Sequence, residues 1–217
     1  MRRKLDPYAS HVARLYMRPI LHLRERKRIR EIEKSIESIL RLATRCEKEG
    51  YADTLSIANR ALYLLMAELD IAFIKADALT HPKEWKRKLY IRLIVLTVFE
   101  WQINHVFGRE FRASLERLGC DKSVTERLTQ ALSEFRNSHK KFRYRYKSYR
   151  VETIAHRTPN AISTYREIKQ LSEKEVINST VELYPSIERV LSCITDILTK
   201  YGNVEPMRKI MEDSKKH

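Results

Sequence analysis

The chain has 217 residues, 43% of them hydrophobic, with only four Gly and six Pro. A chain of this length and hydrophobicity can bury a core, which excludes a disordered protein, and the scarcity of turn residues argues against a many-stranded sheet. The net charge of +15 comes from two segments, because residues 1–30 hold ten Lys/Arg against two acids and residues 136–150 hold seven against none. Charge concentrated in this way favours a polyanionic partner, above all nucleic acid.

Cysteine use and hydropathy predict a cytoplasmic protein. Cys46, Cys120 and Cys193 lie far apart and form no CxxC pair, which fits a reducing compartment better than a disulfide framework. The basic N-terminus has its apolar residues interrupted by charges, so we do not interpret it as a signal peptide. The most apolar run, residues 89–99, is too short to cross a bilayer, and we expect no membrane association.

The predicted elements are all helical. Residues 1–22 contain Pro7 and Pro19 as helix breakers and are predicted to form an irregular basic arm. Apolar residues at helical spacing then predict helices over residues 23–48, 52–79 and 83–107. The centre of the second is apolar nearly all round, so we expect it to be central. The third is also apolar on most faces, and the two are predicted to pack against each other and against a second copy of the chain. A weaker helical piece lies between Gly108 and Gly119.

A fourth long helix is predicted over residues 124–156. Asp121 or Ser123 can be its N-cap, and Ser123 with Glu126 matches a capping box. Pro159 disfavours helical geometry in the residue before it, so this helix should stop near His156.

The C-terminal part is predicted as a loop over residues 157–171 followed by one more helix to residue 201. Ser172 and Glu175 form a second capping box at the start of that helix, Pro185 kinks or splits it, and Gly202 ends it. The whole pattern predicts an all-α bundle of four to five main helices. Its predicted organisation is a basic arm (1–22), one helical domain (23–201) and a charged tail (202–217).

Cations and aromatic residues share adjoining stripes of the fourth helix. The cations are Arg136, Lys140, Arg143, Lys147 and Arg150, and the aromatic stripe includes Phe135, His139, Phe142, Tyr146 and Tyr149. Such a pair of stripes suits an RNA backbone with bases stacked beside it. The alternative is that the aromatic rings are core; we favour it for Phe135 and Phe142 and leave it open for Tyr144, Tyr146 and Tyr149. The predicted RNA contacts are Arg136, Lys140, Arg143, Tyr146, Lys147 and Arg157.

The end of this helix carries an Arg150–His156 pair. A cation that holds a phosphate and an imidazole that moves a proton are the minimum for metal-free RNA cleavage. In one straight helix the two residues are separated by about 9 Å of rise and roughly 120° of rotation. Their convergence on one atom therefore needs a bent helix end or a second protomer that supplies its own pair.

The segment from Arg150 to His156, with Ile154-Ala155 before the histidine and Arg157 after it, resembles the HEPN superfamily, whose hallmark is Arg-x(4–6)-His. Of the seven histidines, only His156 has an arginine at this spacing. The flanking residues are similar to the branch linked to abortive infection of phage-infected bacteria. The resemblance covers residues 30–200 as architecture and about eight residues as motif.

The resemblance implies a HEPN-like bundle that dimerises so that two Arg/His pairs face one cleft. It implies a metal-independent endoribonuclease in phage defence or toxin–antitoxin control. His156 would handle the proton of the attacking 2′-hydroxyl, and Arg150 would stabilise the charge that develops on the phosphate. The expected partners are RNA, a second copy of the chain and an antitoxin or regulatory protein. We expect no cofactor and no metal, since the sequence has neither an HExxH motif nor a Gly-rich phosphate loop.

Two positions depart from the family pattern. Val151 follows the arginine where active members usually carry a polar residue, and Thr158 stands where one toxin branch has a modified tyrosine, so we expect no regulation of that kind. Val151 keeps open a non-catalytic HEPN-like module that binds RNA or protein. A further alternative is a helical scaffold whose basic arm grips an acidic protein.

Glu100 interrupts the apolar third helix, and a carboxylate there needs a partner if it is buried. The candidates are Arg92 and the Arg150/His156 cluster; the alternative is an exposed position. We do not count Glu100 among the catalytic residues. His81, His105 and His139 are interpreted as surface or hydrogen-bonded helix residues.

Overall fold

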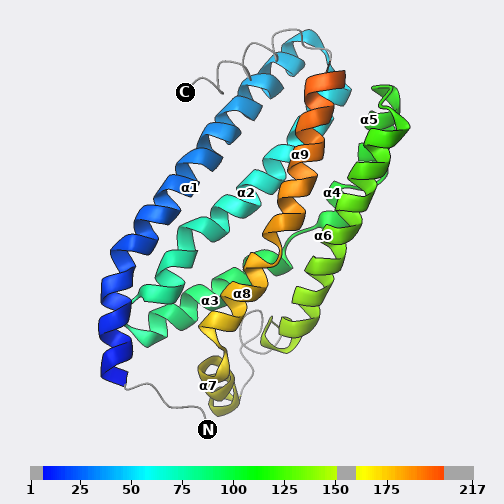
Figure 1. The fold of residues 1–217 in the computed structure, drawn as a ribbon. Coiled ribbons are helices and arrows are strands. Elements are labelled where there is room, and N and C mark those ends of the chain that lie inside the picture. The colour runs from blue at the N-terminus through cyan, green and yellow to red at the C-terminus, as the bar shows by residue number, and fades with distance from the viewer. Residues whose placement is uncertain (1–6, 151–159, 203–217) are drawn as a thin grey trace. The chain divides into compact units, whose positions relative to one another are not determined.

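The structure, a computed structural model, describes residues 7–150 and 160–202 (Figure 1). Its elements are α1 (Pro7–Glu49), α2 (Ala52–Thr80), α3 (Glu84–Phe99), α4 (Ile103–Val106), α5 (Arg109–Arg117), α6 (Lys122–Tyr149), α7 (Ala161–Gln170), α8 (Glu173–Val181) and α9 (Tyr184–Tyr201). Within these two ranges there is no strand, so the all-α prediction is confirmed.

Helix α1 corrects the prediction of an irregular arm. It begins at Pro7, where the missing N–H of proline costs nothing, and it continues through Pro19. Proline removes one hydrogen bond from the middle of a helix, but contacts with α2 hold α1 on both sides of it. Arg18 Nη2 and His22 Nε2 lie 3.0 and 3.4 Å from the same Asp77 carboxylate oxygen. Tertiary contacts thus override the local break, and residues 7–22 are helical.

The described residues divide into two compact units. Unit 1 takes its parts from Met1–Glu31, Ala67–Trp101 and Lys141–Glu182, and unit 2 from Ile32–Met66, Gln102–Lys140 and Leu183–His217. Helices α1, α2 and α6 each contribute one part to each unit. Each unit is therefore assembled from three separate stretches of chain.

The core of unit 1 forms where α3 packs against α8. Ile91, Ile94 and Val95 of α3 and Val176 of α8 are completely buried, and each such side chain contributes about 1.5–3 kcal/mol of transfer free energy. This packing buries part of the apolar surface that the sequence analysis found on the third helix.

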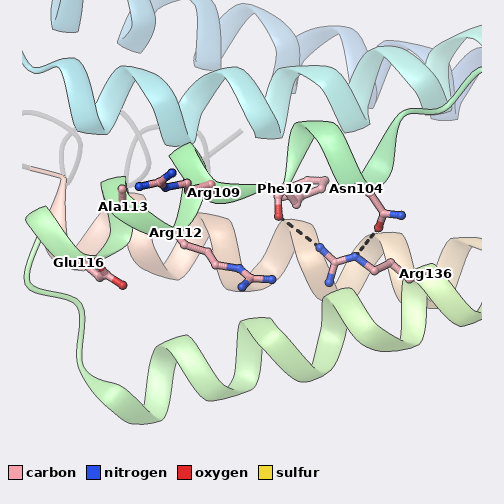
Figure 2. Close-up of a pocket in the computed structure, with 8 residues that line it drawn as sticks. Asn104, Phe107, Arg109, Arg112, Ala113, Glu116 and Arg136 are labelled. Carbon is pink, nitrogen blue, oxygen red and sulfur yellow. Dashed lines mark hydrogen bonds between the residues drawn. The ribbon is translucent and has the colours of Figure 1, made fainter.

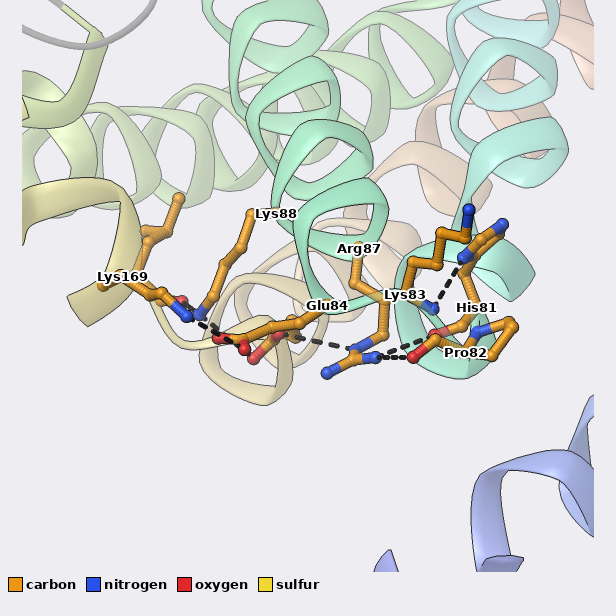
Figure 3. Close-up of polar contacts among 9 residues, drawn as sticks. His81, Pro82, Lys83, Glu84, Arg87, Lys88 and Lys169 are labelled. Atoms are coloured by element: carbon orange, nitrogen blue, oxygen red, sulfur yellow. Dashed lines mark hydrogen bonds and ion pairs between the residues drawn. The ribbon is translucent and has the colours of Figure 1, made fainter. Parts of the chain in front are cut away.

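Two buried cations tie the start of α3 to the α7–α8 junction (Figure 3). Arg87 donates to the carbonyl oxygens of His81 and Pro82 at 2.7 and 3.2 Å, and Lys88 donates to the Leu171 carbonyl at 2.5 Å. The carboxylate of Glu173 lies 3.6 Å from Arg87 and 3.4 Å from Lys88. Buried charges are tolerated when they are paired in this way, so this cluster is a structural network.

Helix α7 replaces part of the loop predicted over residues 157–171. The Asn160 side chain accepts a hydrogen bond from the Ser163 backbone N–H at 3.1 Å, which caps the helix. Tyr165 stacks on Trp85 with 5.9 Å between ring centroids. The sequence prediction missed α7 because Asn160 follows directly after Pro159 and the packing partner is on α3.

The predictions for residues 172–202 are confirmed. Ser172 Oγ accepts from the Glu175 N–H at 3.3 Å at the start of α8. The chain breaks between α8 and α9, and Pro185 lies in the first turn of α9, where a proline is well tolerated. Gly202 follows the last residue of α9.

The third predicted helix ends early. Helix α3 stops at Phe99, with Glu100 as its C-cap, and the short α4 begins only at Ile103. The Gln102 backbone N–H donates to the Tyr63 hydroxyl at 2.8 Å in unit 2. Because this N–H is satisfied by a side chain, the helix does not need to continue, and the prediction of one helix over 83–107 was wrong.

The core of unit 2 is aromatic. Phe107 and Phe111 meet edge to face with 5.2 Å between centroids, and both are 1% exposed, as are Phe135 and Cys46. Burial raises the pKa of the Cys46 thiol.

Gly119 ends α5 with φ of +66°, a left-handed conformation that favours glycine. The helical piece predicted between Gly108 and Gly119 is confirmed.

Helix α6 begins at Lys122 and carries an irregularity near its other end. Asp121 directly precedes it and accepts hydrogen bonds from Lys200 and Tyr201 at 2.6 and 2.5 Å. Ser123 lies inside the helix, so the predicted Ser123–Glu126 capping box is wrong. Tyr146 has φ of −112° and ψ of 15°, which kinks the helix.

Candidate nucleic-acid interface

The candidate interface begins at the kink near the end of α6, in unit 1. Tyr146 interrupts the helix, and Arg150 has π-helical geometry four residues later. A wider turn of this kind redirects side chains and is frequent at functional sites. The predicted single stripe from Arg136 to Arg150 is therefore divided by the kink.

Glu100 holds the Arg150 guanidinium. Arg150 Nη2 donates to Glu100 Oε1 at 3.0 Å, with the two side chains 36% and 57% exposed. Of the two partners considered for Glu100, the structure thus shows Arg150. Glu100 is the C-cap of α3, so the end of one helix fixes the end of another.

Phe99 provides a platform beneath two cations. The guanidinium carbons of Arg143 and Arg150 lie 5.5 and 5.6 Å from the centre of its ring. Phe99 is 7% exposed and packs edge to face on Phe142 at 6.5 Å. Cation–π attraction contributes about 0.5–1 kcal/mol at such sites. It keeps two like charges next to each other at the end of α3.

Arg150 keeps donors for a ligand. The ion pair with Glu100 uses Nη2, and 36% of the side chain is exposed, whereas Nε is buried and out of reach of a ligand. A guanidinium has five N–H donors in a planar fork that matches the oxygens of a phosphate. Arg150 is therefore ordered by Glu100 and Phe99 but not saturated.

The other predicted RNA contacts lie in different surroundings. Lys140, Arg143 and Lys147 are exposed on α6, as expected for residues that contact a phosphate backbone. Arg136 is half-buried and donates to Asn104 Oδ1 at 3.0 Å and to the Phe107 carbonyl at 3.2 Å in unit 2.

Tyr146 is a core residue, which corrects its prediction as an RNA contact. It is 3% exposed, and its hydroxyl lies 3.1 Å from Ser179 Oγ. Arg145 Nη1 donates to the same Ser179 oxygen at 2.5 Å. Burial raises the pKa of Tyr146. A ring in this position is not available to stack on a base, whereas Tyr144 is 87% exposed.

His156, Val151 and Arg157 lie outside the described residues. The convergence of Arg150 and His156, and the contact predicted for Arg157, therefore stay predictions.

Phe99 is the functional candidate that the sequence analysis missed. Its apolar surroundings on α3 indicate only a core position, and no spacing rule connects it with Arg143 and Arg150. The signal that pointed in its direction was Glu100, the charged residue directly after the apolar run.

No group of three or more His, Cys, Asp or Glu side chains suited to a metal ion occurs in residues 7–150 and 160–202. Likewise, none of the helices described is long and apolar enough to cross a membrane.

Comparisons of this chain with family models, curated proteins and solved structures found no match.

Proposed function

We propose that this chain is a metal-independent endoribonuclease of the HEPN type that acts in the cytoplasm in phage defence or toxin–antitoxin control. Its substrate is RNA, its bundle is HEPN-like, and it works as a homodimer with a regulatory protein as a further partner. His156 is the general acid and base, and Arg150 is the phosphate clamp across the dimer cleft.

The observation that carries the proposal is the fixed position of Arg150. Glu100 holds it at 3.0 Å and Phe99 lies beneath it, while its side chain remains 36% exposed. Donors positioned before the reaction stabilise developing charge without reorganisation in the transition state. Lys147 and Arg143 on the same helix supply the attraction that brings a polyanion to it.

The proposed reaction is an internal transesterification. One His156 takes the proton of the 2′-hydroxyl as the 2′-oxygen bonds to the adjacent phosphorus. The P–O5′ bond breaks, and the leaving oxygen receives a proton from the His156 of the second protomer. Arg150 stabilises the charge on the pentacoordinate phosphorus. The products carry a 2′,3′-cyclic phosphate and a 5′-hydroxyl.

Exposed apolar side chains in unit 1 support the homodimer. Phe73 of α2 and Leu89 and Leu93 of α3 are 55%, 46% and 39% exposed. Leu89 and Leu93 are four residues apart and share one face of α3. Burial of such a face against a second copy removes apolar surface from water.

The test is a cleavage assay on total and defined RNA in the presence of EDTA. Wild-type protein should cleave, and His156→Ala should be at least about 100-fold slower because general acid–base catalysis is lost. His105→Ala, a change at an exposed histidine, should cleave at the wild-type rate. Unchanged cleavage by His156→Ala would refute the proposal.

One observation favours a second function, a non-catalytic HEPN-like module that binds RNA or protein. The Glu100 carboxylate already neutralises part of the charge of Arg150, and Val151 departs from the polar residue usual in active members. This function predicts RNA affinity that falls with salt and no product from the wild-type protein.

A further inference from the structure

A second cationic site lies in unit 2, in a pocket between the α4–α5 turn and α6 (Figure 2). The pocket has a volume of about 750 Å³, within the range of sites that take small organic ligands. Its polar lining consists of Asn104, Gly108, Arg109, Arg112, Glu116 and Arg136. Three arginines and one carboxylate therefore line it.

Arg136 is the fixed member of the pocket. Its Nε donates to Asn104 Oδ1 at 3.0 Å and its Nη2 to the Phe107 carbonyl at 3.2 Å. These two bonds orient the guanidinium plane and leave other N–H groups to donate. Because Asn104 uses its oxygen toward Arg136, its amide NH₂ is also left to donate.

Arg112 brings a second positive charge to Arg136. Figure 2 shows the Arg112 side chain extending from α5 toward the Arg136 guanidinium on α6. Burial of Arg136 and the charge of Arg112 both lower the pKa of Arg136. A bound anion next to Arg136 would offset both the burial and the repulsion that disfavour its charged form.

Among residues 7–150 and 160–202, no carboxylate forms an ion pair with Arg112 or Arg136. Within the described ranges no ion pair joins Glu116 to Arg109, Arg112 or Arg136. The first residue of α5, Arg109, also lines the pocket, so the positive end of that helix adds to the field.

Gly108 lets the turn approach the pocket closely. A Cβ atom at this position would lie 3.1 Å from the carbonyl oxygens of both Asn104 and His105. The absence of a side chain keeps the α4–α5 turn tight and holds Asn104 near Arg136.

We propose that this pocket binds a phosphate monoester, the doubly charged terminal phosphate of a nucleotide or of an RNA 5′ end. Guanidinium groups bind phosphate through paired N–H···O bonds, and two facing guanidinium groups match the two charges of a monoester better than the single charge of a phosphodiester. The pocket volume leaves room for the attached nucleoside.

The test is calorimetric titration of the full chain with adenosine 5′-monophosphate and with adenosine. The monophosphate should bind and adenosine should not. Arg112→Gln should weaken monophosphate binding about tenfold or more, since it removes a charged group that donates hydrogen bonds to the phosphate. Arg112 is exposed, so this change should leave the thermal unfolding midpoint unaltered.

Arg127→Gln is the matched control, because Arg127 lies on α6 outside the pocket and is 59% exposed. It should bind the monophosphate within about twofold of wild type. Equal binding of adenosine and its monophosphate, or equal weakening by Arg112→Gln and Arg127→Gln, would overturn the proposal. Neither measurement involves cleavage or His156, so the proposed nuclease is unaffected by a failure here.

Two octaribonucleotides distinguish the sources of the phosphate. Preference for a 5′-phosphorylated strand over the same strand with a 5′-hydroxyl assigns the site to an RNA end. Equal affinity for the two strands, together with binding of the free monophosphate, assigns it to a nucleotide.

Discussion

Glu100 is the residue that decides how Arg150 is presented. Its carboxylate accepts from Arg150 at 3.0 Å while more than half of its side chain is exposed. In the proposed enzyme it is a positioning residue, since it acts on RNA only through Arg150. A purely electrostatic role would have the opposite effect, because a carboxylate repels phosphate.

Substitution of Glu100 by Gln separates the two roles. If Glu100 positions Arg150, we expect the single-turnover cleavage rate to fall about tenfold while RNA affinity stays within about twofold. Rate measured with enzyme in excess and affinity from filter binding give the two quantities. Glu182→Gln, the same change at an exposed acid of unit 1, should alter neither. Tighter RNA binding with an unchanged rate would contradict the positioning role.

Tyr146 offers a test of burial at one residue. Tyr146→Phe removes the hydroxyl that meets Ser179 and should lower the free energy of unfolding by about 1 kcal/mol. RNA affinity should not change, because the ring is buried. Urea denaturation and RNA titration measure the two effects.

Tyr144→Phe is the control, since Tyr144 is 87% exposed; its unfolding free energy should stay at the wild-type value. Loss of RNA affinity in Tyr146→Phe with stability intact would show that Tyr146 reaches RNA after all.

The sequence could indicate Arg150 and the exposed cations of α6, but it could not separate Tyr146 from an RNA contact. Phe135, Phe142 and Tyr146 follow one helical spacing, and the same spacing describes a core stripe and a stacking surface. The deciding partner, Ser179, lies on α8. Contacts between helices distant in sequence leave no trace in local periodicity.

At the scale of the helices, the sequence correctly predicted those helix ends that are set by a capping side chain or a glycine. Ser172 capped α8 and Gly119 ended α5 as expected. The prediction failed for the start of α1 and for α7, because there contacts with α2 and α3 outweigh the prolines nearby. The breaks that prolines predict are tendencies of an isolated chain.

The start of α2 carries an ion pair that gives unit 2 a pH dependence. Arg117 contacts both carboxylate oxygens of Asp53, through Nε at 2.9 and 3.0 Å and through Nη2 at 2.6 Å. Hydrogen bonds from Arg117 hold the pKa of Asp53 below its usual value. Asp53 also lies in the first turn of α2, where a negative charge favours the helix.

Asp53→Asn should therefore be less stable than wild type at neutral pH, by about 0.5–1 kcal/mol for a well-formed surface pair. The stabilisation is complete above the unfolded-state pKa of about 3.9 and disappears as pH falls through the lower folded-state pKa. Urea denaturation of both proteins at pH 7 and near pH 2.5 should show the gap closing. Asp70→Asn, at an exposed position of the same helix, should show no gap at either pH; a gap for Asp53→Asn that persists in acid would contradict the ion-pair origin.

At the scale of the whole molecule, the charge distribution predicts how RNA binding depends on salt. Lys140 and Lys147 are exposed on α6 within the segment that has seven cations and no acid. If each neutralises one phosphate of a single strand, each Lys→Gln change should reduce the slope of log affinity against log salt by about 0.7.

Lys34→Gln removes an exposed lysine of α1 outside that segment and should leave the slope at its wild-type value. Filter binding between low and moderate salt gives these slopes. Identical slopes for Lys140→Gln and wild type would place the RNA elsewhere on the molecule.

The alkylation rate of the buried Cys46 thiol reports how often the structure around it opens. Cys46 is 1% exposed and burial raises its pKa, so an alkylating reagent can modify it only after unit 2 opens around α1. The ratio of its alkylation rate in the native chain to that in the unfolded chain then measures the free energy of this opening. The same measurement with adenosine 5′-monophosphate present would show whether a ligand in the pocket lined by Arg109, Arg112 and Arg136 makes local opening of unit 2 less frequent.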